Sequence, residues 1–228
     1  MRQSDYEVIE KYMCQCMSDS AHDREHVYRV LYIALDIAEH EKEVNMDILI
    51  SACLLHDIGR KEQFENPALC HAQVGAKKAY DFLVSEGYGE DFAKKAASCI
   101  KSHRYRSDNE PDTIEAKILF DADKIDATGA LGIARTLFYI GHVEEPLYSL
   151  DSEGNVSDGT KDTEPSFFQE YKYKLEKLYG KFYTKRGGQI AARRQGAASF
   201  FYESMCHEVQ ESYAVGKGLL AAKVKGKG

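Results

Sequence analysis

The sequence predicts an all-α fold, and three features of the chain favour it. Ala, Leu, Ile, Glu and Lys recur at three- and four-residue spacing, which is the period of helices with one buried face. Alternating β-branched segments are scarce, and only 4 prolines occur among 228 residues. One long segment is apolar on all sides, as expected of a central helix. We therefore expect a helical bundle.

Length and composition indicate one domain. A chain of 228 residues is long enough for one sizeable core. No change of composition and no segment rich in proline and serine marks a linker. We expect a single domain over residues 1–216, followed by a mobile tail at residues 217–228 in which lysines alternate with glycines.

The first two helices are predicted from a cap and an apolar stripe. Ser4-Asp5-Tyr6-Glu7 has the spacing of a capping box and opens a helix that runs to about Ser18. After a break at residues 20–23, a second helix runs to about Glu41. His26 lies on its buried face, one turn before Val30. The rest of that face is Val27, Leu31, Ala34, Ile37 and Ala38.

The most uniformly apolar stretch, Met46 to Ile58, predicts a helix buried on all sides. Asn45 and Asp47 have the positions of its cap and first-turn acid, and His56 and Asp57 come at its end. A carboxylate there would cost several kcal/mol unless a cation or strong donors compensated it. A divalent metal explains the pair, although a helix-ending histidine beside a capping aspartate is the structural alternative.

The remaining chain predicts further helices, a charged patch and a long loop. Arg60-Lys61-Glu62 is either a solvated loop or the rim of a substrate site. Three acids, Asp121, Asp123 and Asp126, end one of the helices, and residues 141–165 form a polar segment typical of a lid, an interaction segment or disorder. The helices are expected at about residues 71–86, 91–103, 113–126, 166–179 and 184–213.

Separated segments of the chain together resemble one family. His26, the pair His56-Asp57 and Asp123 follow one another in helical surroundings. This order resembles the HD-domain superfamily of metal-dependent phosphohydrolases over about residues 20–140. Residues 126–135, Asp-Ala-Thr-Gly-Ala-Leu-Gly-Ile-Ala-Arg, look like the signature of its standalone bacterial branch. The resemblance implies that His26, His56, Asp57 and Asp123 hold one divalent metal, which is Mn, Mg, Fe, Ni, Co or Zn.

Further side chains are expected to support this site. His71 and His103 stand where some members of the superfamily hold a second metal, and where others bind substrate phosphate or protonate the leaving group. A helix-terminal histidine that stabilises the end dipole is the alternative, and it fits His103 better than His71. His22 and Asp126 are expected to orient or support the ligands without holding the metal.

Four basic side chains are candidates for contact with substrate phosphate. Lys124 follows Asp123, and Arg135 ends the small-residue run, where a structural ion pair is the alternative. Arg29 lies three residues after His26, and a surface pair with a glutamate is its alternative. Arg194 is expected against the core or in the pocket floor, where it needs an anionic partner. Its helix face would also contain Ile190, Ala197, Phe201, Met205 and Val209.

Charge and hydropathy exclude some partners. The net charge of −7 argues against binding of a nucleic acid polymer. The chain contains no long apolar run and no apolar signal core near Met1, so we expect a cytoplasmic protein without a membrane partner. An apolar helix face used in a homodimer would look the same as one buried within the chain, and a homodimer is possible.

The resemblance implies hydrolysis of a phosphoester or phosphoanhydride bond in a soluble nucleotide. A nucleoside triphosphate is the expected substrate, because members of this kind are small and lack regulatory domains. The metal would activate water, while Lys124, Arg135 or His103 steadies the leaving charge. The alternatives are a nucleoside monophosphate phosphatase, a di-iron oxygenase that uses both His71 and His103, and a non-catalytic module that senses a nucleotide.

Overall fold

The computed structural model divides the chain into two compact units. Helices, one short 3-10 helix and one isolated β-bridge make up its regular structure over the described residues, so the predicted all-α fold is confirmed. One domain over residues 1–216 stays a prediction beside this division. The description covers residues 1–17, 24–104 and 109–224. The first unit is Met1–Asp126 with Phe182–Gln189, and the second is Ala127–Lys181 with Ile190–Gly228.

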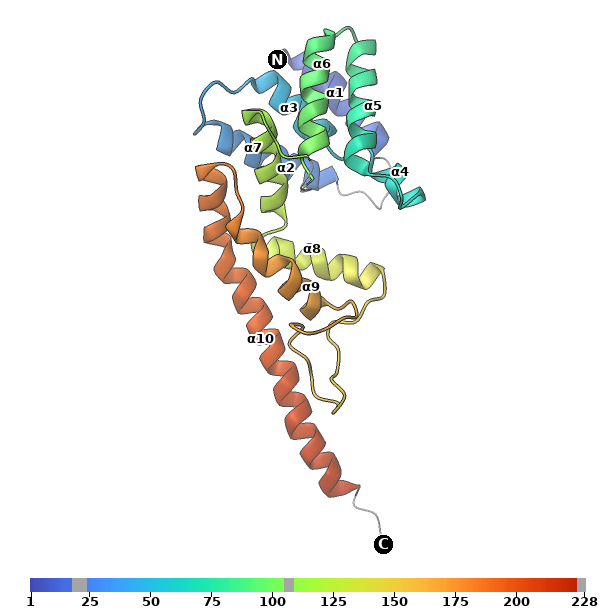
Figure 1. Ribbon diagram of the computed structural model, residues 1–228, viewed down its shortest axis with the longest axis vertical. Helices are drawn as coiled ribbons and strands as arrows, with labels where there is room; N and C mark the ends of the chain where they lie inside the picture. Colours follow the sequence, from blue (N-terminus) through green and yellow to red (C-terminus); the bar gives the residue numbers. More distant parts are fainter. Residues whose placement is uncertain (18–23, 105–108, 225–228) are drawn as a thin grey trace. The chain divides into compact units, whose positions relative to one another are not determined.

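The first unit is a bundle arranged around α3 (Met46–Leu55) (Figure 1). This helix packs against α1, α2, α5, α6 and α7 and is buried along most of its length, as its apolar sequence predicts. The side chain of Asn45 accepts a hydrogen bond from the backbone N–H of Ile48 (3.2 Å), which confirms the predicted cap. The other helices of the unit are α1 (Gln3–Cys16), α2 (Arg24–Ala38), α4 (Arg60–Glu65), α5 (His71–Ser85), α6 (Glu90–Ser102) and α7 (Ile114–Asp126).

The end of α3 differs from the prediction. The helix stops at Leu55, so His56 and Asp57 lie in a tight turn instead of in a last helical turn. The short helix α4 follows, at the position where the sequence predicted either a solvated loop or the rim of a substrate site. Both differences place His56 and Asp57 in the turn between α3 and α4.

The second unit contains α8 (Gly129–His142), α9 (Phe167–Tyr173), a 3-10 helix at Leu175–Gly180 and most of α10 (Lys185–Lys223). Its core combines aromatic and aliphatic side chains, and Tyr171 stacks on Tyr202 with ring centroids 4.0 Å apart. The other buried residues of this core are Ile133, Ile140, Val156, Phe167, Phe168, Leu175, Ala198 and Cys206.

The buried face of α10 differs from the predicted one in its middle part, while Ile190 is buried and Met205 and Val209 pack against the core as predicted. Ala197 is exposed and Phe201 is 41% exposed, whereas Ala198 and Tyr202 are buried. A shift of one residue turns a helix by about 100°, and the stack of Tyr202 on Tyr171 selects this rotation. Arg194 is consequently half-buried and not a core residue, with its Cβ 2.9 Å from the position that a Cβ on Gly129 would take.

The end of α10 also differs from the prediction. The helix continues to Lys223, so the tail predicted from residue 217 begins as helix, because this stretch is rich in Leu, Ala and Lys. The side-chain ammonium of Lys217 donates to Asn155 Oδ1 (3.1 Å). Residues 225–228 lie outside the described residues.

The acidic segment before α9 is tied down by its own hydrogen bonds. Ser149 and Ser157 both donate from their hydroxyls to the carboxylate of Asp162, at 2.6 and 2.5 Å. The hydroxyl of Tyr202 donates to the backbone carbonyl of Asp158 (2.5 Å). Of the sequence alternatives for residues 141–165, the described contacts favour a packed segment over disorder.

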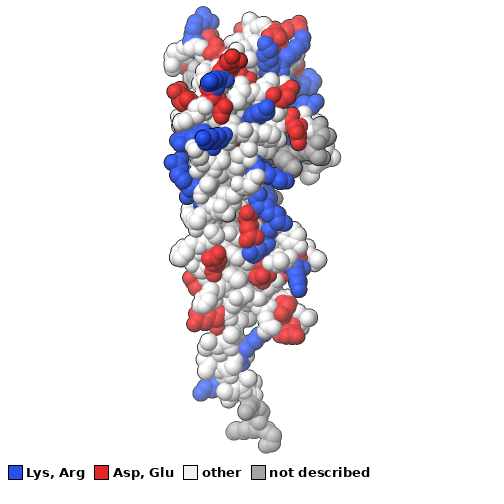
Figure 2. All heavy atoms as spheres, turned by 60° about the vertical axis from the view of Figure 1, so that its left-hand side comes forward, with Lys and Arg blue, Asp and Glu red and all other residues white. Residues whose placement is uncertain are grey.

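Two further observations concern the apolarity of the helices and the charge on the surface. None of the helices in the described part of the chain combines the length and apolarity needed to cross a membrane. The face drawn in Figure 2 mixes basic and acidic side chains, in keeping with the net charge of −7. Neither observation identifies a partner.

Candidate metal centre

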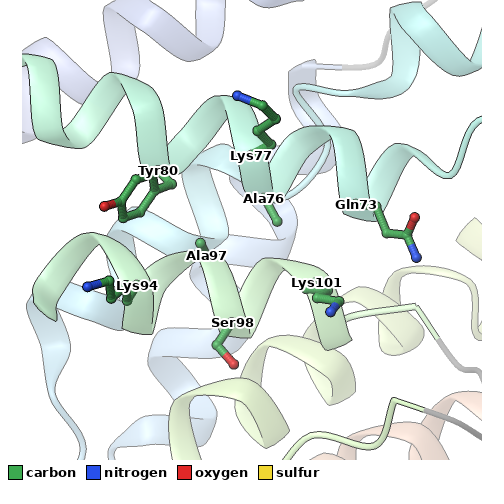
Figure 3. Close-up of a pocket in the computed structure, with 8 residues that line it drawn as sticks. All are labelled: Gln73, Ala76, Lys77, Tyr80, Lys94, Ala97, Ser98 and Lys101. Carbon is green, nitrogen blue, oxygen red and sulfur yellow. The ribbon is translucent and has the colours of Figure 1, made fainter. Parts of the chain in front are cut away.

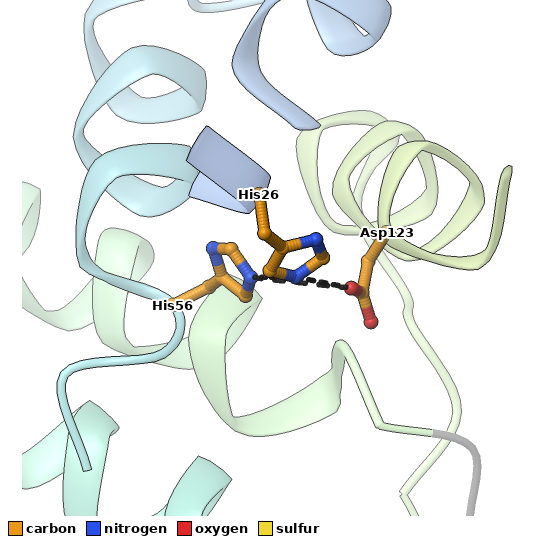
Figure 4. Close-up of side chains that lie close together, drawn as sticks. All are labelled: His26, His56 and Asp123. Carbon is orange, nitrogen blue, oxygen red and sulfur yellow. Dashed lines mark hydrogen bonds and ion pairs between the residues drawn. The ribbon is translucent and has the colours of Figure 1, made fainter. Parts of the chain in front are cut away.

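The side chains proposed as ligands converge in the first unit. His26 comes from α2, His56 from the turn after α3 and Asp123 from α7, and all three point toward one another (Figure 4). Nε2 of His26 lies 3.3 Å from Nε2 of His56 and 3.2 Å from Oδ1 of Asp123. Oδ2 of Asp57 lies 3.5 Å from Nε2 of His26 and 3.6 Å from Nε2 of His56. We call these four residues the first cluster.

The hydrogen bonds of the two imidazoles determine which nitrogen faces the cluster as an acceptor. Nδ1 of His56 lies 2.7 Å from the carbonyl oxygen of Cys53, and Nδ1 of His26 lies 2.7 Å from Oδ2 of Asp126. Both oxygens accept, so Nδ1 is the donor in each ring and Nε2 of a neutral ring carries a lone pair. Lone pairs of two nitrogens and two carboxylates therefore converge, and a cation is the species that satisfies them all.

Asp126 holds His26 from behind, as the sequence predicted for an orienting acid. Its carboxylate is fully buried and also accepts hydrogen bonds from Arg29, at 2.8 Å from Nε and 3.1 Å from Nη2. Arg29 thus pairs with a buried aspartate. The carboxylate of Asp121 instead accepts from the backbone N–H and hydroxyl of Thr184 (both 2.7 Å), just before α10.

A second cluster lies on the opposite oxygen of Asp57. Nε2 of His71 and Nε2 of His103 are 3.2 Å apart, and they lie 3.6 and 3.7 Å from Oδ1 of Asp57. Both rings are buried. Their Nδ1 atoms lie 2.7 Å from Oε1 of Gln63 and 2.6 Å from the carbonyl oxygen of Ile100. By the same tautomer argument, Nε2 of each neutral ring is an acceptor, so this second cluster also has the donor set of a metal site.

One contact distinguishes the second cluster from the first. Nε of Arg60 donates to Oδ1 of Asp57 at 2.9 Å, so a guanidinium already occupies one side of the oxygen that faces His71 and His103. The Arg60 side chain is 40% exposed, while that of Asp57 is 5% exposed. The aspartate therefore has a partner of its own on this side.

Close backbone packing brings the two clusters to one aspartate. A Cβ on Gly59 would lie 2.4 Å from the carbonyl oxygen of His71 and 2.6 Å from the backbone nitrogen of Gly75. Only glycine allows the turn after α3 to approach α5 so closely. Gly75 belongs to a buried face of small residues on this helix, with Ala72, Ala76 and Ala79.

Charges around the clusters shift histidine pKa values in opposite directions. Burial alone would lower the pKa of His26, but hydrogen bonds to Asp123 and Asp126 outweigh it and raise this pKa to about 9. Burial and then the positive charge of Arg60 lower the pKa of His71 to about 3. The carboxylates beside His26 thus favour its positive charge, whereas the surroundings of His71 disfavour a positive charge on that ring.

The residues of the turn after α3 follow the same rules. Burial lowers the pKa of His56 to about 4, because the neighbouring carboxylates compensate only part of the desolvation. Burial would raise the pKa of Asp57, but Arg60 and then His56 hold it well below its usual range. Asp57 is therefore a carboxylate at neutral pH and is available as a ligand.

The roles of the other predicted residues stay predictions. The ammonium of Lys124 lies over the ring of Phe182, 4.6 Å from its centroid, so its known contact is a cation–π interaction. Arg135 and Arg194 belong to the second unit, and their roles toward phosphate stay predictions. His22 lies outside the described residues.

Some residues of the site were not predicted from the sequence. Gln63 positions His71, and the ammonium of Lys78 donates to the carbonyl oxygen of Ile58 (2.8 Å) and to Oε1 of Glu62 (2.7 Å). Arg60 was considered only as part of a charged patch. Its spacing of three residues from Asp57 was the available signal, because residues three apart lie on one face of a helical turn.

A shallow hollow between α5 and α6 lies apart from these clusters (Figure 3). Its volume is about 620 Å³, and Lys77, Lys94 and Lys101 are among the side chains that line it. Lys77 pairs with Asp81 (2.6 Å) and Lys94 with Glu90 (2.9 Å). These carboxylates neutralise much of the positive charge, so the hollow makes no case for a separate phosphate site.

Comparison with known proteins agrees with this geometry. The HD domain family model matches residues 24–128, which contain both clusters. YpgQ of Bacillus subtilis, a protein named as uncharacterized, is 31% identical over 179 residues, which are 77% of this chain and 78% of that protein. The chain belongs to the HD-domain family. As a member of this family it is a hydrolase, and its His and Asp clusters are those expected of a divalent-metal site.

Solved structures of HD-domain proteins share the fold. A crystal structure of YpgQ in complex with ADP has 25% identity and a TM-score of 0.68, and the match covers 90% of this chain and 97% of that one. An HD-superfamily hydrolase from Bacillus thuringiensis has 28% identity and a TM-score of 0.69, with 91% of this chain and 98% of that chain covered.

One relative has a named activity. Dihydroneopterin 2',3'-cyclic phosphate phosphodiesterase of Methanocaldococcus jannaschii is 31% identical over 112 residues. The match covers 45% of each chain.

Proposed function

We propose that this HD-domain protein cleaves a phosphoanhydride bond of a nucleoside triphosphate with one divalent metal in the first cluster. The observation that carries the proposal is the convergence of Nε2 of His26, Nε2 of His56 and carboxylate oxygens of Asp57 and Asp123. A mixed nitrogen and oxygen set of this kind suits Mn, Mg, Fe, Ni, Co or Zn and leaves room for water and phosphate.

The choice of a nucleotide rests on the relatives. YpgQ has been crystallised with ADP, and the relative from Methanocaldococcus jannaschii is named as a phosphodiesterase. The first names a nucleoside diphosphate as a bound molecule, and the second names an enzyme that acts on a cyclic phosphate. A nucleoside triphosphate as substrate of this chain extends these printed names and is part of the proposal.

The roles of the chain's own residues follow from their contacts. When bound, a divalent ion supplies a Lewis acid that lowers the pKa of water and polarises a phosphoryl oxygen. Asp126 keeps the Nδ1 proton of His26 in place and so fixes the orientation of that ring. Lys124, Arg135 and Arg194 are proposed to attract the phosphates, a role that only substrate binding can test.

His103 has a restricted role in this proposal. Its Nδ1 lies 2.6 Å from the carbonyl oxygen of Ile100, so the neutral ring offers Nε2 as an acceptor. Donation of a proton to a leaving group would therefore require prior protonation of Nε2. Acceptance of a proton, or of a hydrogen bond from water, requires none.

One alternative is favoured by a specific observation. A di-iron oxygenase needs both His71 and His103 as ligands, and their Nε2 atoms face the same oxygen of Asp57. Iron content and consumption of dioxygen distinguish this alternative, because a phosphohydrolase consumes none. A nucleoside monophosphate phosphatase and a nucleotide sensor differ from the proposal in product and in turnover.

The test is release of phosphate and of pyrophosphate from a panel of nucleoside mono-, di- and triphosphates and 2',3'-cyclic nucleotides, with Mn, Mg, Co and Ni. The variant Asp57→Ala removes a proposed ligand. Asp91→Ala, which removes an exposed carboxylate paired with Lys95, is the matched control. We expect metal-dependent hydrolysis of a triphosphate that is lost only in Asp57→Ala. Hydrolysis confined to monophosphates or cyclic phosphates, or nucleotide binding without turnover, would overturn the triphosphate assignment.

A further inference from the structure

The carboxylate of Asp57 is shared between two sites that compete for it unequally. Its Oδ2 faces His26 and His56, and its Oδ1 faces His71 and His103. A metal at each site would make this carboxylate a bridge between two ions. The contacts of Oδ1 therefore decide whether the second cluster fills.

Arg60 is already bound to the oxygen that a second metal would need. Its Nε donates to Oδ1 of Asp57 at 2.9 Å, which is shorter than the 3.6 Å from that oxygen to Nε2 of His71. A guanidinium is permanently charged and cannot yield by losing its proton. A divalent ion between His71 and His103 would thus lie close to a fixed positive charge and would share with it the carboxylate of Asp57, the one acid of this cluster among the described residues.

The position of Arg60 is held by the structure around it. Lys78 on α5 donates to the carbonyl oxygen of Ile58 and to Oε1 of Glu62, and so ties the turn that carries Asp57 to the first turn of α4. Gly59, between Asp57 and Arg60, packs against the backbone of His71. Swinging Arg60 away from Asp57 gives up a hydrogen bond to a buried carboxylate.

We propose that Arg60 takes the place of a second cation, so that the chain works with one metal in the first cluster while His71 and His103 stay without one. In this arrangement the guanidinium neutralises Oδ1 of Asp57 and leaves Oδ2 for the metal. The inference rests on the proposed function, because it presumes a metal in the first cluster. It assigns Arg60 as a positioning residue that sets the number of metal ions.

The experiment counts metal ions and does not depend on activity. Metal-free protein is titrated with Mn²⁺ by calorimetry, and the bound metal is measured by elemental analysis after equilibration. The variants are Arg60→Gln, which removes the charge, Arg60→Lys, which keeps it, and Lys61→Gln, which removes a neighbouring exposed charge from the same helix. The double variant Arg60→Gln with His103→Ala shows whether any new metal lies in the second cluster.

We expect one tightly bound Mn²⁺ per chain in the unmodified protein, in Arg60→Lys and in Lys61→Gln. In Arg60→Gln a second Mn²⁺ should bind at least about tenfold more tightly than it does to the unmodified protein. His103→Ala in that background should return the count to one. Two equally tight ions in the unmodified protein would overturn the inference without any variant.

The inference would also be overturned if the affinity for the second Mn²⁺ were unchanged in Arg60→Gln, or if Arg60→Gln lost the first metal. The inference can fail while the proposed function stands. In that case the unmodified protein hydrolyses a triphosphate with either metal count. Conversely, a metal-loaded protein that hydrolyses nothing removes the proposed function, while the metal counts still test Arg60.

Discussion

The first and second clusters are built from the same parts and differ in the charge around them. Each has two buried histidines whose Nδ1 atoms are hydrogen-bonded and whose Nε2 atoms lie 3.3 or 3.2 Å apart. Each faces one oxygen of Asp57. The first also has Asp123, with Asp126 behind His26, and the pKa of His26 is raised to about 9. The second has the positive charge of Arg60, and the pKa of His71 is lowered to about 3.

In the proposed arrangement with one metal, histidine geometry alone does not identify a working metal site. Two facing imidazoles supply donors, but carboxylates supply the negative charge that compensates a divalent ion. The first cluster has both, whereas among the described residues the second cluster shares the carboxylate of Asp57 and contains no other. The following predictions test whether this contrast in charge decides where the metal binds.

The largest expected effect separates the clusters by activity. Asp123→Ala removes the carboxylate that only the first cluster has, and we expect it to lower metal-dependent hydrolysis by about 1,000-fold. His103→Ala removes a donor of the second cluster and should cost at most about tenfold. The rates of both variants are compared at saturating Mn²⁺. Equal losses in the two variants would mean that both clusters work as one centre.

The second prediction concerns stability after metal removal. A metal at about 1,000 times its Kd stabilises the native state by about 4 kcal/mol, and chelation should remove this contribution. His103→Ala should show the same decrease on chelation, whereas Asp123→Ala should show little, because it has lost the site. Urea unfolding with and without chelator measures the change. An unchanged unfolding curve after complete metal removal, verified by elemental analysis, contradicts the first cluster as a metal site.

The third prediction concerns how the stability of the metal-free protein depends on pH, because the pKa values of its buried histidines are shifted in opposite directions. The pKa of His26 is raised to about 9 in the folded, metal-free protein, so its stabilising contribution is present below about pH 6.5 and is lost as the pH rises to about 9. The pKa values of His56 and His71 are lowered to about 4 and about 3, so their contribution is lost as the pH falls below about 6.5.

The expected size follows from the shift of His26. Metal-free protein should lose on the order of 3 kcal/mol of unfolding free energy between pH 6.5 and 9. Metal affinity should rise over the same range, because binding displaces the His26 proton. Unfolding in chelator at a series of pH values measures the loss, and His26→Asn should not show it. Stability that increases from pH 6.5 to 9 in the metal-free protein contradicts the acidic character of the first cluster.

The smallest expected effect comes from the acid behind His26. Asp126→Asn should weaken metal binding by about 10- to 100-fold, because it loosens the orientation of the ring without removing a ligand. Asp36→Asn is the matched control, because Asp36 lies on α2 with His26 and its carboxylate is paired with Arg186 at 2.8 Å. Calorimetric titration with Mn²⁺ compares the two. Equal affinities in both variants would show that His26 needs no support from Asp126.

Much of this architecture could be predicted from the sequence. The apolar run from Met46 predicted the buried α3, and the order of His26, His56-Asp57 and Asp123 predicted residues that the fold brings together. The sequence predicted that Asp121 or Asp126 would orient a ligand without deciding between them by geometry, and Asp126 was assigned this role. In the structure the carboxylate of Asp126 lies 2.7 Å from Nδ1 of His26.

The rest depended on features that a helical period does not encode. The side-chain rotation of Asp57 decides which oxygen faces which cluster, and the contact with Arg60 follows from the turn that ends α3 early. The rotation of α10 was off by one residue because exposed and buried apolar side chains alternate closely there, and the stack with Tyr171 selects one of the faces. Packing between distant residues decided each of these points.

The most direct test of the central claim is a metal titration of activity. Metal-free protein is supplied with increasing amounts of Mn²⁺, and hydrolysis of a nucleoside triphosphate is measured after each addition. If one metal in the first cluster supports hydrolysis, the rate rises in proportion to added metal and reaches its plateau at one ion per chain. A plateau only at two ions per chain, or no recovery of hydrolysis with metal bound, would contradict it.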